Sequence, residues 1–480
     1  IWAVYGVGVL LSIFIASYLY MTRNFGYWKK RGILELPPKP FIGNFLDCFL
    51  FRTSVPNFLR SVYELGEGLP YLGFYLFDKP VLVLRDPEII KGILVKDFEC
   101  FPNRYSTSTD TDVVGTSNLF LLKTPTWKSL RTKLTPVFTS GKMKAMFPLV
   151  TDVGDDLRQH FVSLGLQGDR EFCRVTELKE ICAKYTTDVI GSCVFGLRVN
   201  SLKNPNAEFR KYGKKIFDVT YRRGFELMSV FFIPGIVKPL GFKAFEASYV
   251  KDNQTDHNDP NTFSFDGDRL VAQAAVFFAA GFETSSALMS FTLHELSLQP
   301  DIQTKLRDEI NTAISENDGK LTYDLVHRLP YLDKVTSETL RKYPSVPFLD
   351  RHTARDYTIP KTGLVIEKGT PVYIPLLGMH YDPEYFPNPE KFDPERFNEE
   401  DKLKRTPFTY LPFGDGPRNC IGLRFGLMQA KVGIIKVISN FEISPCEKTL
   451  IPMKFDPKSL LLASNGGLYH QIRQIETTVD

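Results

Sequence analysis

The chain has 480 residues, of which 43% are hydrophobic and 24% charged, and its formal net charge is only +4. These values are ordinary for a globular protein with a large core, and the small charge argues against nucleic acid as a partner. The seven cysteines form no C-x-x-C pair, which indicates a reducing compartment and argues against a disulfide framework or a structural zinc site.

The first stretch, residues 1–22, has the properties of a membrane anchor. Residues 1–21 carry no charge and are long enough, as a helix, to cross a bilayer core. A cleaved signal peptide and a core helix are the alternatives, although the charges and cleavage site of a signal peptide are missing. Aromatic residues near both ends suit the bilayer interfaces, and the basic residues that follow predict a cytosolic location for the rest of the chain. These residues are Trp2, Tyr5, Tyr18, Tyr20, Arg23, Lys29, Lys30 and Arg31.

Residues 23–40 are basic and then rich in proline, so we expect a linker between the anchor and a single domain over residues 41–480. Residues 71–85 predict a pair of strands, and residues 101–125, rich in Thr, Ser, Asp and Gly, predict a loop.

Helices are expected over residues 175–195 and 207–217. The stretch 237–268 is short, and its Asn- and Asp-rich part, residues 252–259, predicts a solvated loop. Short strands are expected at residues 358–359, 364–366 and 371–377, and a hairpin tip at 461–469. The expected fold class is therefore mainly α with small β-sheets.

Residues 270–296 form a long apolar stretch that predicts a core helix, and a polar break interrupts it at Gly281, Glu283 and Thr284. Gly281 weakens the helix, and the Thr284 hydroxyl can bond to a carbonyl one turn earlier, opening a small groove. An acid beside an alcohol at such a break could hold a chain of water molecules. A Glu283 that is simply paired or solvated is the alternative.

Cys420 lies in a glycine-rich loop just before the apolar residues 423–439, which predict a buried helix. Backbone N–H groups and the helix dipole at that position favour a thiolate, and an iron ion would favour it further. A cysteine thiolate is one of the axial ligands of haem iron. Phe413 would shield the sulfur from water, and Arg418 would reach a haem propionate. The alternative is an inert core cysteine.

The pattern Phe413-x-x-Gly-x-Arg418-x-Cys420-x-Gly422 resembles the haem-ligand signature of the cytochrome P-450 superfamily at every fixed position. The resemblance implies haem b, with Cys420 as its metal ligand, between the long distal helix and the helix after Cys420.

The same resemblance implies roles for other motifs. The break at residues 280–284 matches the distal-helix motif, in which Glu283 and Thr284 pass protons to dioxygen. Glu338 and Arg341, together with Arg396, match a buried clamp that we interpret as structural. The residues expected to bind haem are Trp127, Arg131, Ala280, Arg351, Phe413, Arg418 and Gly422, with His352 as an alternative to Arg351.

The implied substrate pocket is mostly apolar, which suits lipophilic substrates. The motifs are most similar to those of the insect microsomal branch that metabolises xenobiotics. The expected pocket residues are Phe120, Leu121, Leu122, Phe277, Ala280, Val346, Phe348 and Ser464.

The implied activity is a monooxygenase that inserts one oxygen atom of O2 into xenobiotics or endogenous lipids and hormones. The sequence has no dinucleotide-binding fingerprint, so electrons from NADPH must come through a partner. The resemblance implies a membrane-bound NADPH-dependent flavoprotein reductase, with cytochrome b5 as a further donor, and a domain on the cytosolic face of the endoplasmic reticulum. A basic docking patch is expected at Lys128, Lys133, Arg424 and Lys431, with a merely solvated face as the alternative.

Two other functions stay open from the sequence. One is a haem-thiolate isomerase or dehydratase, against which the Glu283 and Thr284 pair argues. The other is a haem-binding protein without catalysis, because the lid region at residues 237–268 is shorter than in the family by roughly two dozen residues.

Overall fold

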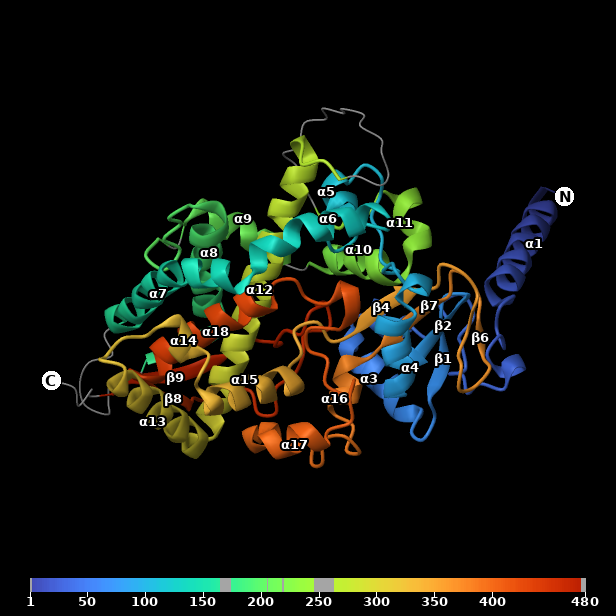
Figure 1. Cartoon of the computed structure of the whole chain (residues 1–480). Helices are drawn as coiled ribbons and strands as arrows, with labels where there is room; N and C mark the ends of the chain where they lie inside the picture. The colour runs from blue at the N-terminus through green and yellow to red at the C-terminus, as the bar shows by residue number, and fades with distance from the viewer. Residues whose placement is uncertain (1, 165–173, 205, 218–219, 246–262, 476–480) are drawn as a thin grey trace.

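The computed structural model describes residues 2–164, 174–204, 206–217, 220–245 and 263–475, and the described chain is mainly helical with three small sheets (Figure 1). The longer helices are α1 (Trp2–Thr22), α3 (Val55–Leu65), α6 (Thr126–Leu134), α7 (Ser140–Ser163), α8 (Leu178–Phe195), α9 (Glu208–Phe217), α10 (Tyr221–Phe232), α12 (Gly267–Leu298), α13 (Pro300–Glu316), α15 (Pro330–Lys342) and α18 (Leu423–Ile438). Shorter helices are α2 (Leu46–Phe49), α4 (Pro87–Lys91), α5 (Val113–Ser117), α11 (Pro234–Leu240), α14 (Tyr323–Val326), α16 (Leu376–His380) and α17 (Glu399–Lys404).

The largest sheet has the strand order β1-β2-β7-β4. Its first two strands form the predicted antiparallel pair, in which Tyr71 faces Leu84. A second sheet has the order β3-β9-β8, and β5 and β6 form a separate hairpin. The strands are β1 (Tyr71–Leu76), β2 (Lys79–Leu84), β3 (Arg174–Glu177), β4 (Leu349–His352), β5 (Tyr357–Thr358), β6 (Val365–Ile366), β7 (Pro371–Ile374), β8 (Phe441–Pro445) and β9 (Tyr469–Gln474).

The predicted core helix is confirmed as α12, which runs through the middle of the molecule (Figure 1). Its C-terminal half is buried on all sides because it packs among α8, α15 and α18. The contact with α18 is close at Gly433, where a Cβ atom would lie 2.3 Å from the Met289 methyl group. The helix expected from residue 175 begins only at Leu178, because residues 174–177 pair with β9 instead.

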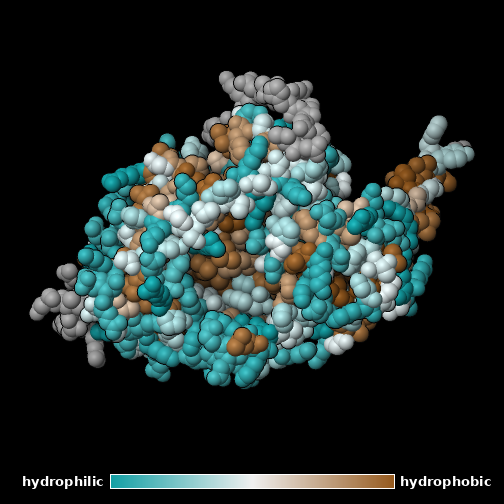
Figure 2. All heavy atoms as spheres, viewed as in Figure 1, coloured by the Kyte–Doolittle hydropathy of each residue, from teal (hydrophilic) through white to brown (hydrophobic). Residues whose placement is uncertain are grey.

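The N-terminal helix α1 extends away from the body, and none of its residues is buried (Figures 1 and 2). Among the described residues, α1 and α12 are long and apolar enough to cross a membrane, but α12 is largely buried inside the protein. Contacts near the base of α1 tie it to the body: the rings of Phe14 and Phe41 are 5.7 Å apart, and Arg23 pairs with Asp78 at 2.7 Å.

Residues 23–40, predicted to be a linker, pack as part of the body. Trp28 is completely buried, and a Cβ atom on Gly73 would collide with its indole ring. The Gly73 N–H donates to the Leu34 carbonyl at 2.8 Å, and the Leu36 N–H donates to the Gly73 carbonyl at 3.0 Å. These two hydrogen bonds add the segment to the edge of β1. The prolines therefore favour an extended edge rather than a free hinge.

The predicted loop at residues 101–125 contains one short helix, α5, and a cover of α10 and α11 lies on it (Figure 1). The buried Asp112 joins the two layers, because its carboxylate accepts hydrogen bonds from Ser108 and from the N–H groups of Ala244 and Phe245. The loop predicted at residues 252–259 lies outside the described residues.

Candidate functional site

A cavity of about 270 Å³ lies between α6, α12, β4 and the segment that leads into α18. Apolar surface lines a hollow near the middle of the molecule in Figure 2. The cavity contacts most of the residues expected from the sequence to bind haem or substrate: Phe120, Trp127, Arg131, Phe277, Ala280, Thr284, Val346, Arg351, Phe413, Arg418, Cys420 and Gly422.

The loop before α18 presents Cys420 to this cavity. The N–H of Cys420 donates to the Phe413 carbonyl at 2.9 Å, which closes the loop. Gly414 and Gly416 both have positive φ angles, of 66° and 71°. At Gly416 the backbone also passes so close to Leu94 that a Cβ atom would lie 2.0 Å from the Leu94 carbonyl oxygen. Glycine is therefore required there by both conformation and space.

The electrostatic expectation for Cys420 is corrected by its surroundings. The thiol is accessible from the cavity, but protein surrounds it on its other sides. Burial raises the pKa of Cys420, and this effect exceeds the opposing influence of the Gly422 N–H and the Arg131 charge. The loop alone therefore favours a thiol, and a bound metal ion is what would favour the thiolate.

Four arginines converge on the cavity. Arg418 lies 4.1 Å from the Trp127 ring centre and donates to the Pro102 and Leu122 carbonyls. Arg131 donates to Asn419 through two nitrogens, at 3.0 and 2.7 Å.

Arg104, which the sequence analysis did not identify, is the fourth member of this group and pairs with the buried Asp350 at 3.0 Å. The sequence signal for Arg104 is weak, because it is a single arginine in a loop that also contains Asp110, Asp112 and Lys123. The ring Nδ1 of His352 donates to the Arg104 carbonyl at 3.1 Å, and His352 does not line the cavity.

The cluster carries more positive charge than its one buried carboxylate can balance. Arg351 is almost completely buried, and its Nε atom has no partner among the described residues. Burial and the neighbouring Arg104 lower the pKa of Arg351 to about 9 despite Asp350. Burial, Arg104 and Arg351 likewise lower the pKa of Arg418 to about 8. An anionic ligand in the cavity would supply the missing negative charge.

The polar break on α12 faces the cavity at Ala280 and Thr284. The Thr284 hydroxyl donates to the Ala280 carbonyl at 2.7 Å, as expected, which leaves the hydroxyl oxygen free to accept a hydrogen bond. Gly281 gives α12 room beside α8, because a Cβ atom there would lie 2.3 Å from the Ile190 side chain.

Glu283 does not line the cavity, contrary to its expected position beside Thr284. Its carboxylate pairs with Lys179 of α8 at 2.9 Å, and Lys179 also donates to Ser286 at 2.6 Å. Lys179 lies more than a hundred residues away in the chain, so the sequence motif gave no sign of this ion pair.

Four expected pocket residues also lie outside the cavity. Side chains alternate between the two faces of β4, and Leu349 and Arg351 face the cavity. Phe348, next to Leu349, therefore points to the opposite side. Phe348 packs on Phe232 instead, with ring centres 5.2 Å apart.

The other three have local partners. Leu121 packs with Val230 and Val237 under the cover, and Leu122 packs in the cluster around Trp127. Ser464 pairs with Phe455 in the tail, although the nearby Leu462 N–H reaches the cavity residue Ser345.

Glu338 and Arg341 are completely buried and form two hydrogen bonds, at 2.7 and 2.9 Å. Arg396 approaches the same carboxylate at 3.4 Å, and the Asp393 N–H donates to it at 2.9 Å. Arg341 also donates to the His380 carbonyl at 2.8 Å. The group thus joins α15 to the end of α16 and to the segment before α17, away from the cavity.

One thiol facing an apolar cavity rimmed by arginines and Trp127 defines a haem-thiolate protein. A single thiol on an apolar cavity suits iron that arrives in a macrocycle and needs one protein ligand. The guanidinium of Arg351, whose Nε has no partner among the described residues, and the other guanidinium groups fit the two propionates of haem b.

The sequence profile of the family Cytochrome P450 matches residues 35–252 and 243–470, and the chain belongs to this family. Cytochrome P450 6k1 of Blattella germanica is 44% identical, covering 96% of this chain and 95% of the relative. Probable cytochrome P450 6g2 of Drosophila melanogaster is 39% identical, covering 96% of this chain and 98% of the relative. Cytochrome P450 9e2 of Blattella germanica is 37% identical, covering 95% of this chain and 95% of the relative. The predicted family, its insect branch and haem b are confirmed. The chain is a membrane-anchored haem-thiolate monooxygenase.

The alignments also bear on the lid. The alignment with cytochrome P450 6k1 spans 507 positions, more than the 480 residues of the chain, so the relative has residues that this chain lacks. The family match divides into two segments that overlap at residues 243–252. This division falls in the stretch where the sequence predicts a shortened lid.

Proposed function

We propose that Cys420 is the axial ligand in a monooxygenase of lipophilic compounds, supplied with electrons by an NADPH-dependent flavoprotein reductase. The observation that carries the proposal is the position of Cys420 and Thr284 on one apolar cavity whose rim holds four arginines. The isomerase or dehydratase and the non-catalytic haem protein are not favoured by the comparisons with the insect relatives.

When bound, the haem supplies thiolate-assisted activation of O2 for transfer of one oxygen atom to a C–H bond. Trp127, Arg131, Arg351 and Arg418 would hold its propionates, and Arg104 would add a further donor. Phe413 and Gly422 line the cavity with Cys420, where Phe413 would shield the sulfur from water and Gly422 would let the macrocycle lie against α18.

Thr284 would hold a proton-donating water molecule at the cavity wall. Its hydroxyl hydrogen is directed at the Ala280 carbonyl, so its oxygen accepts a hydrogen bond from water or another ligand in the cavity. Glu283 acts as the proton source only after its side chain leaves Lys179, because their ion pair directs the carboxylate to α8. We therefore assign Lys179 as the residue that positions Glu283.

The walls of the cavity select lipophilic substrates. Phe120, Phe277 and Val346 supply apolar surface at the positions expected from the sequence, and Ile190 and Leu349 extend it. Xenobiotics and endogenous lipids or hormones both have this chemistry.

The redox partner docks on the face formed by α6 and the start of α18, next to the cysteine loop. Lys128 and Arg424 are exposed there, whereas Lys431 is buried against Asp333, so we remove Lys431 from the expected patch. Lys133 is also exposed, and its ammonium group donates to the Phe263 carbonyl. Cytochrome b5 can use the same basic face, and the location is the endoplasmic reticulum with the catalytic domain in the cytosol.

The proposal is tested with the full chain loaded with haem. Carbon monoxide added to the reduced protein should give the shifted Soret band of a thiolate complex, and Cys420→Ala should abolish it. Cys446→Ala is the matched control, because Cys446 lies in the tail and not on the cavity. An unshifted band in the fully loaded parent protein would refute Cys420 as the ligand.

Turnover with reductase, NADPH and a panel of lipophilic substrates tests the activity. Thr284→Ala should lower product formed per NADPH by roughly 10²-fold, the lower range of proton-transfer catalysis. Ser290→Ala, a hydroxyl loss six residues further along α12 and outside the cavity, should leave this ratio nearly unchanged. An equal loss in both variants would contradict a specific role for Thr284.

A further inference from the structure

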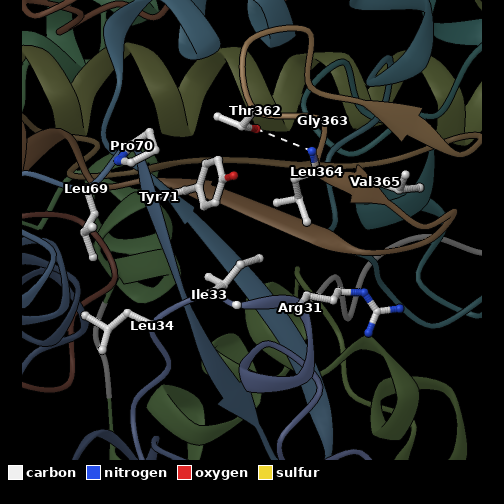
Figure 3. Close-up of a pocket in the computed structure, with 11 residues that line it drawn as sticks. Arg31, Ile33, Leu34, Leu69, Pro70, Tyr71, Thr362, Gly363, Leu364 and Val365 are labelled. Carbon is white, nitrogen blue, oxygen red and sulfur yellow. Dashed lines mark hydrogen bonds between the residues drawn. The ribbon is translucent and has the colours of Figure 1, made fainter.

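A second cavity, of about 490 Å³, lies between the segment after α1, the start of β1 and the β5–β6 hairpin. Figure 3 shows Ile33, Tyr71 and Leu364 in the middle of this hollow, with Arg31 at one side. The residues that line it are Arg31, Gly32, Ile33, Leu34, Leu69, Pro70, Tyr71, Thr362, Gly363, Leu364 and Val365. The haem-thiolate site uses none of these residues.

The hollow lies close to the membrane anchor. Arg31 follows the end of α1 at Thr22 by nine residues, which span at most about 30 Å even when fully extended. The connection is shorter in practice, because Trp28 is buried in the body. Contacts of Phe14 with Phe41 and of Arg23 with Asp78 hold the base of α1 beside the same end of the protein.

The surroundings of the hollow are amphipathic. Leu34, Leu69 and Val365 are large aliphatic side chains that are 48%, 39% and 43% exposed around this one cavity. Such a grouping of exposed apolar residues marks an interaction surface.

Positive charge borders the apolar part. Lys29 and Lys30 are exposed immediately before Arg31. Glu367 pairs with Arg31 at 2.5 Å, and the Glu35 carboxylate accepts the Lys29 N–H at 3.1 Å. The three basic residues therefore exceed these two carboxylates by one positive charge. A ligand that suits the whole site has an apolar chain and an anionic head.

We propose that this hollow binds a phospholipid of the membrane that α1 enters, with an acyl chain against Leu34, Leu69 and Leu364 and an anionic headgroup near Lys29 and Lys30. The site is continuous with the anchor, and basic residues beside an anchor attract anionic lipids. The bound lipid fixes how the catalytic domain lies on the bilayer. This inference rests on the membrane attachment of the chain and not on the chemistry at Cys420.

The test uses the full haem-loaded chain in phosphatidylcholine vesicles that contain phosphatidylserine with a photoreactive diazirine in its acyl chain. After illumination, mass spectrometry of peptides should find lipid adducts within residues 31–34, 69–71 or 362–365, in addition to α1. The variant Leu34→Asp/Leu364→Asp should lose at least about tenfold of the adducts at the hollow, because two apolar contacts are lost. Adducts on α1 should stay unchanged in this variant.

Leu403→Asp is the matched control, because Leu403 is an equally apolar side chain, 87% exposed, on α17. It should leave the labelling of the hollow unchanged. Adducts confined to α1 in the parent protein, or equal labelling around Leu403, would overturn the proposal. Replacing phosphatidylserine by a phosphatidylcholine probe should weaken the labelling, and equal labelling would refute the headgroup assignment. The carbon monoxide spectrum of the same samples reports on the haem site separately, so failure of either proposal is recognised independently.

Discussion

Gly414 and Gly416 separate two reasons why glycine occurs in the cysteine loop. Both have positive φ angles, but a Cβ atom at Gly414 would meet only the Leu349 side chain, at 3.7 Å, whereas at Gly416 it would strike the Leu94 carbonyl. We expect Gly414→Ala to cost roughly 1–2 kcal/mol, the cost of a left-handed conformation for alanine, and to retain haem. Gly416→Ala should lose most bound haem, because the loop must move away from residue 94.

The measurement is the ratio of haem absorbance to protein in both purified variants, together with the Soret band of the reduced carbon monoxide complex. Gly414→Ala serves as the control for conformational strain alone. Equal haem loss in the two variants would show that conformation, and not the close approach to Leu94, limits the loop.

Local motifs predicted the residues whose function depends on their immediate neighbours. Cys420 and Thr284 were found because a turn or a helix sets their position within a few residues. Arg104 and the Lys179 partner of Glu283 could not be found in this way, because distant segments bring them to the site. The displacement of Phe348 from the pocket depended on a strand register that its sequence did not reveal.

At the scale of elements, α12 and β9 are joined by a buried pair of histidines. The rings of His294 and His470 approach within 3.0 Å between nitrogens, and both side chains are almost completely buried. Burial lowers the pKa of each to about 4, with added repulsion from Lys342 for His294 and from His294 for His470. Both residues are therefore neutral in the folded protein above pH 4.

This pair predicts a loss of stability in mild acid. In the unfolded chain each histidine binds a proton below about pH 6.5, whereas in the folded protein each does so only below about pH 4. The stability that is present above pH 6.5 is therefore lost as the pH falls from 6.5 to 4. The loss should amount to a few kcal/mol for the pair. Between pH 7 and pH 4.5, the melting temperature of the double variant His294→Leu/His470→Leu should fall less than that of the parent protein.

Melting followed by circular dichroism at several pH values checks this prediction. The difference between variant and parent at pH 8 gives the cost of packing alone, because all the histidines concerned are neutral there. Parallel pH profiles for the two proteins would rule out the pair as a source of acid sensitivity.

The helices and strands were largely predictable from the sequence, because runs of apolar residues and the prolines that bound them are local signals. The strands of β1 and β2 and the course of α12 followed from such patterns. The packing of residues 23–40 did not, because the burial of Trp28 depends on the absence of a side chain at Gly73, far along the chain. The hydrogen bonds from Ala244 and Phe245 to Asp112 likewise join the cover to a loop far from it in the sequence.

At the scale of the whole molecule, two surfaces must be used at once: the anchor end at the bilayer and the face of α6 and α18 at the redox partner. Figure 1 shows α1 at one end of the molecule and α18 nearer the other, so membrane attachment leaves the proposed docking face free. Lys128 and Arg424 provide the exposed charge there, and Arg424 also bonds to Ser140 at 2.9 Å.

The double variant Lys128→Glu/Arg424→Glu should raise the reductase concentration needed for half-maximal turnover by about tenfold at low salt, because opposite charge on this face slows association with an acidic partner. The rate at saturating reductase should stay nearly unchanged, since neither residue lines the cavity. In 1 M salt the difference should largely disappear, as screening shortens the reach of charges to about 3 Å. Lys404→Glu, an exposed lysine on α17, is the control and should have little effect. A similar change in the control, or a difference that persists in high salt, would show that the reductase binds elsewhere.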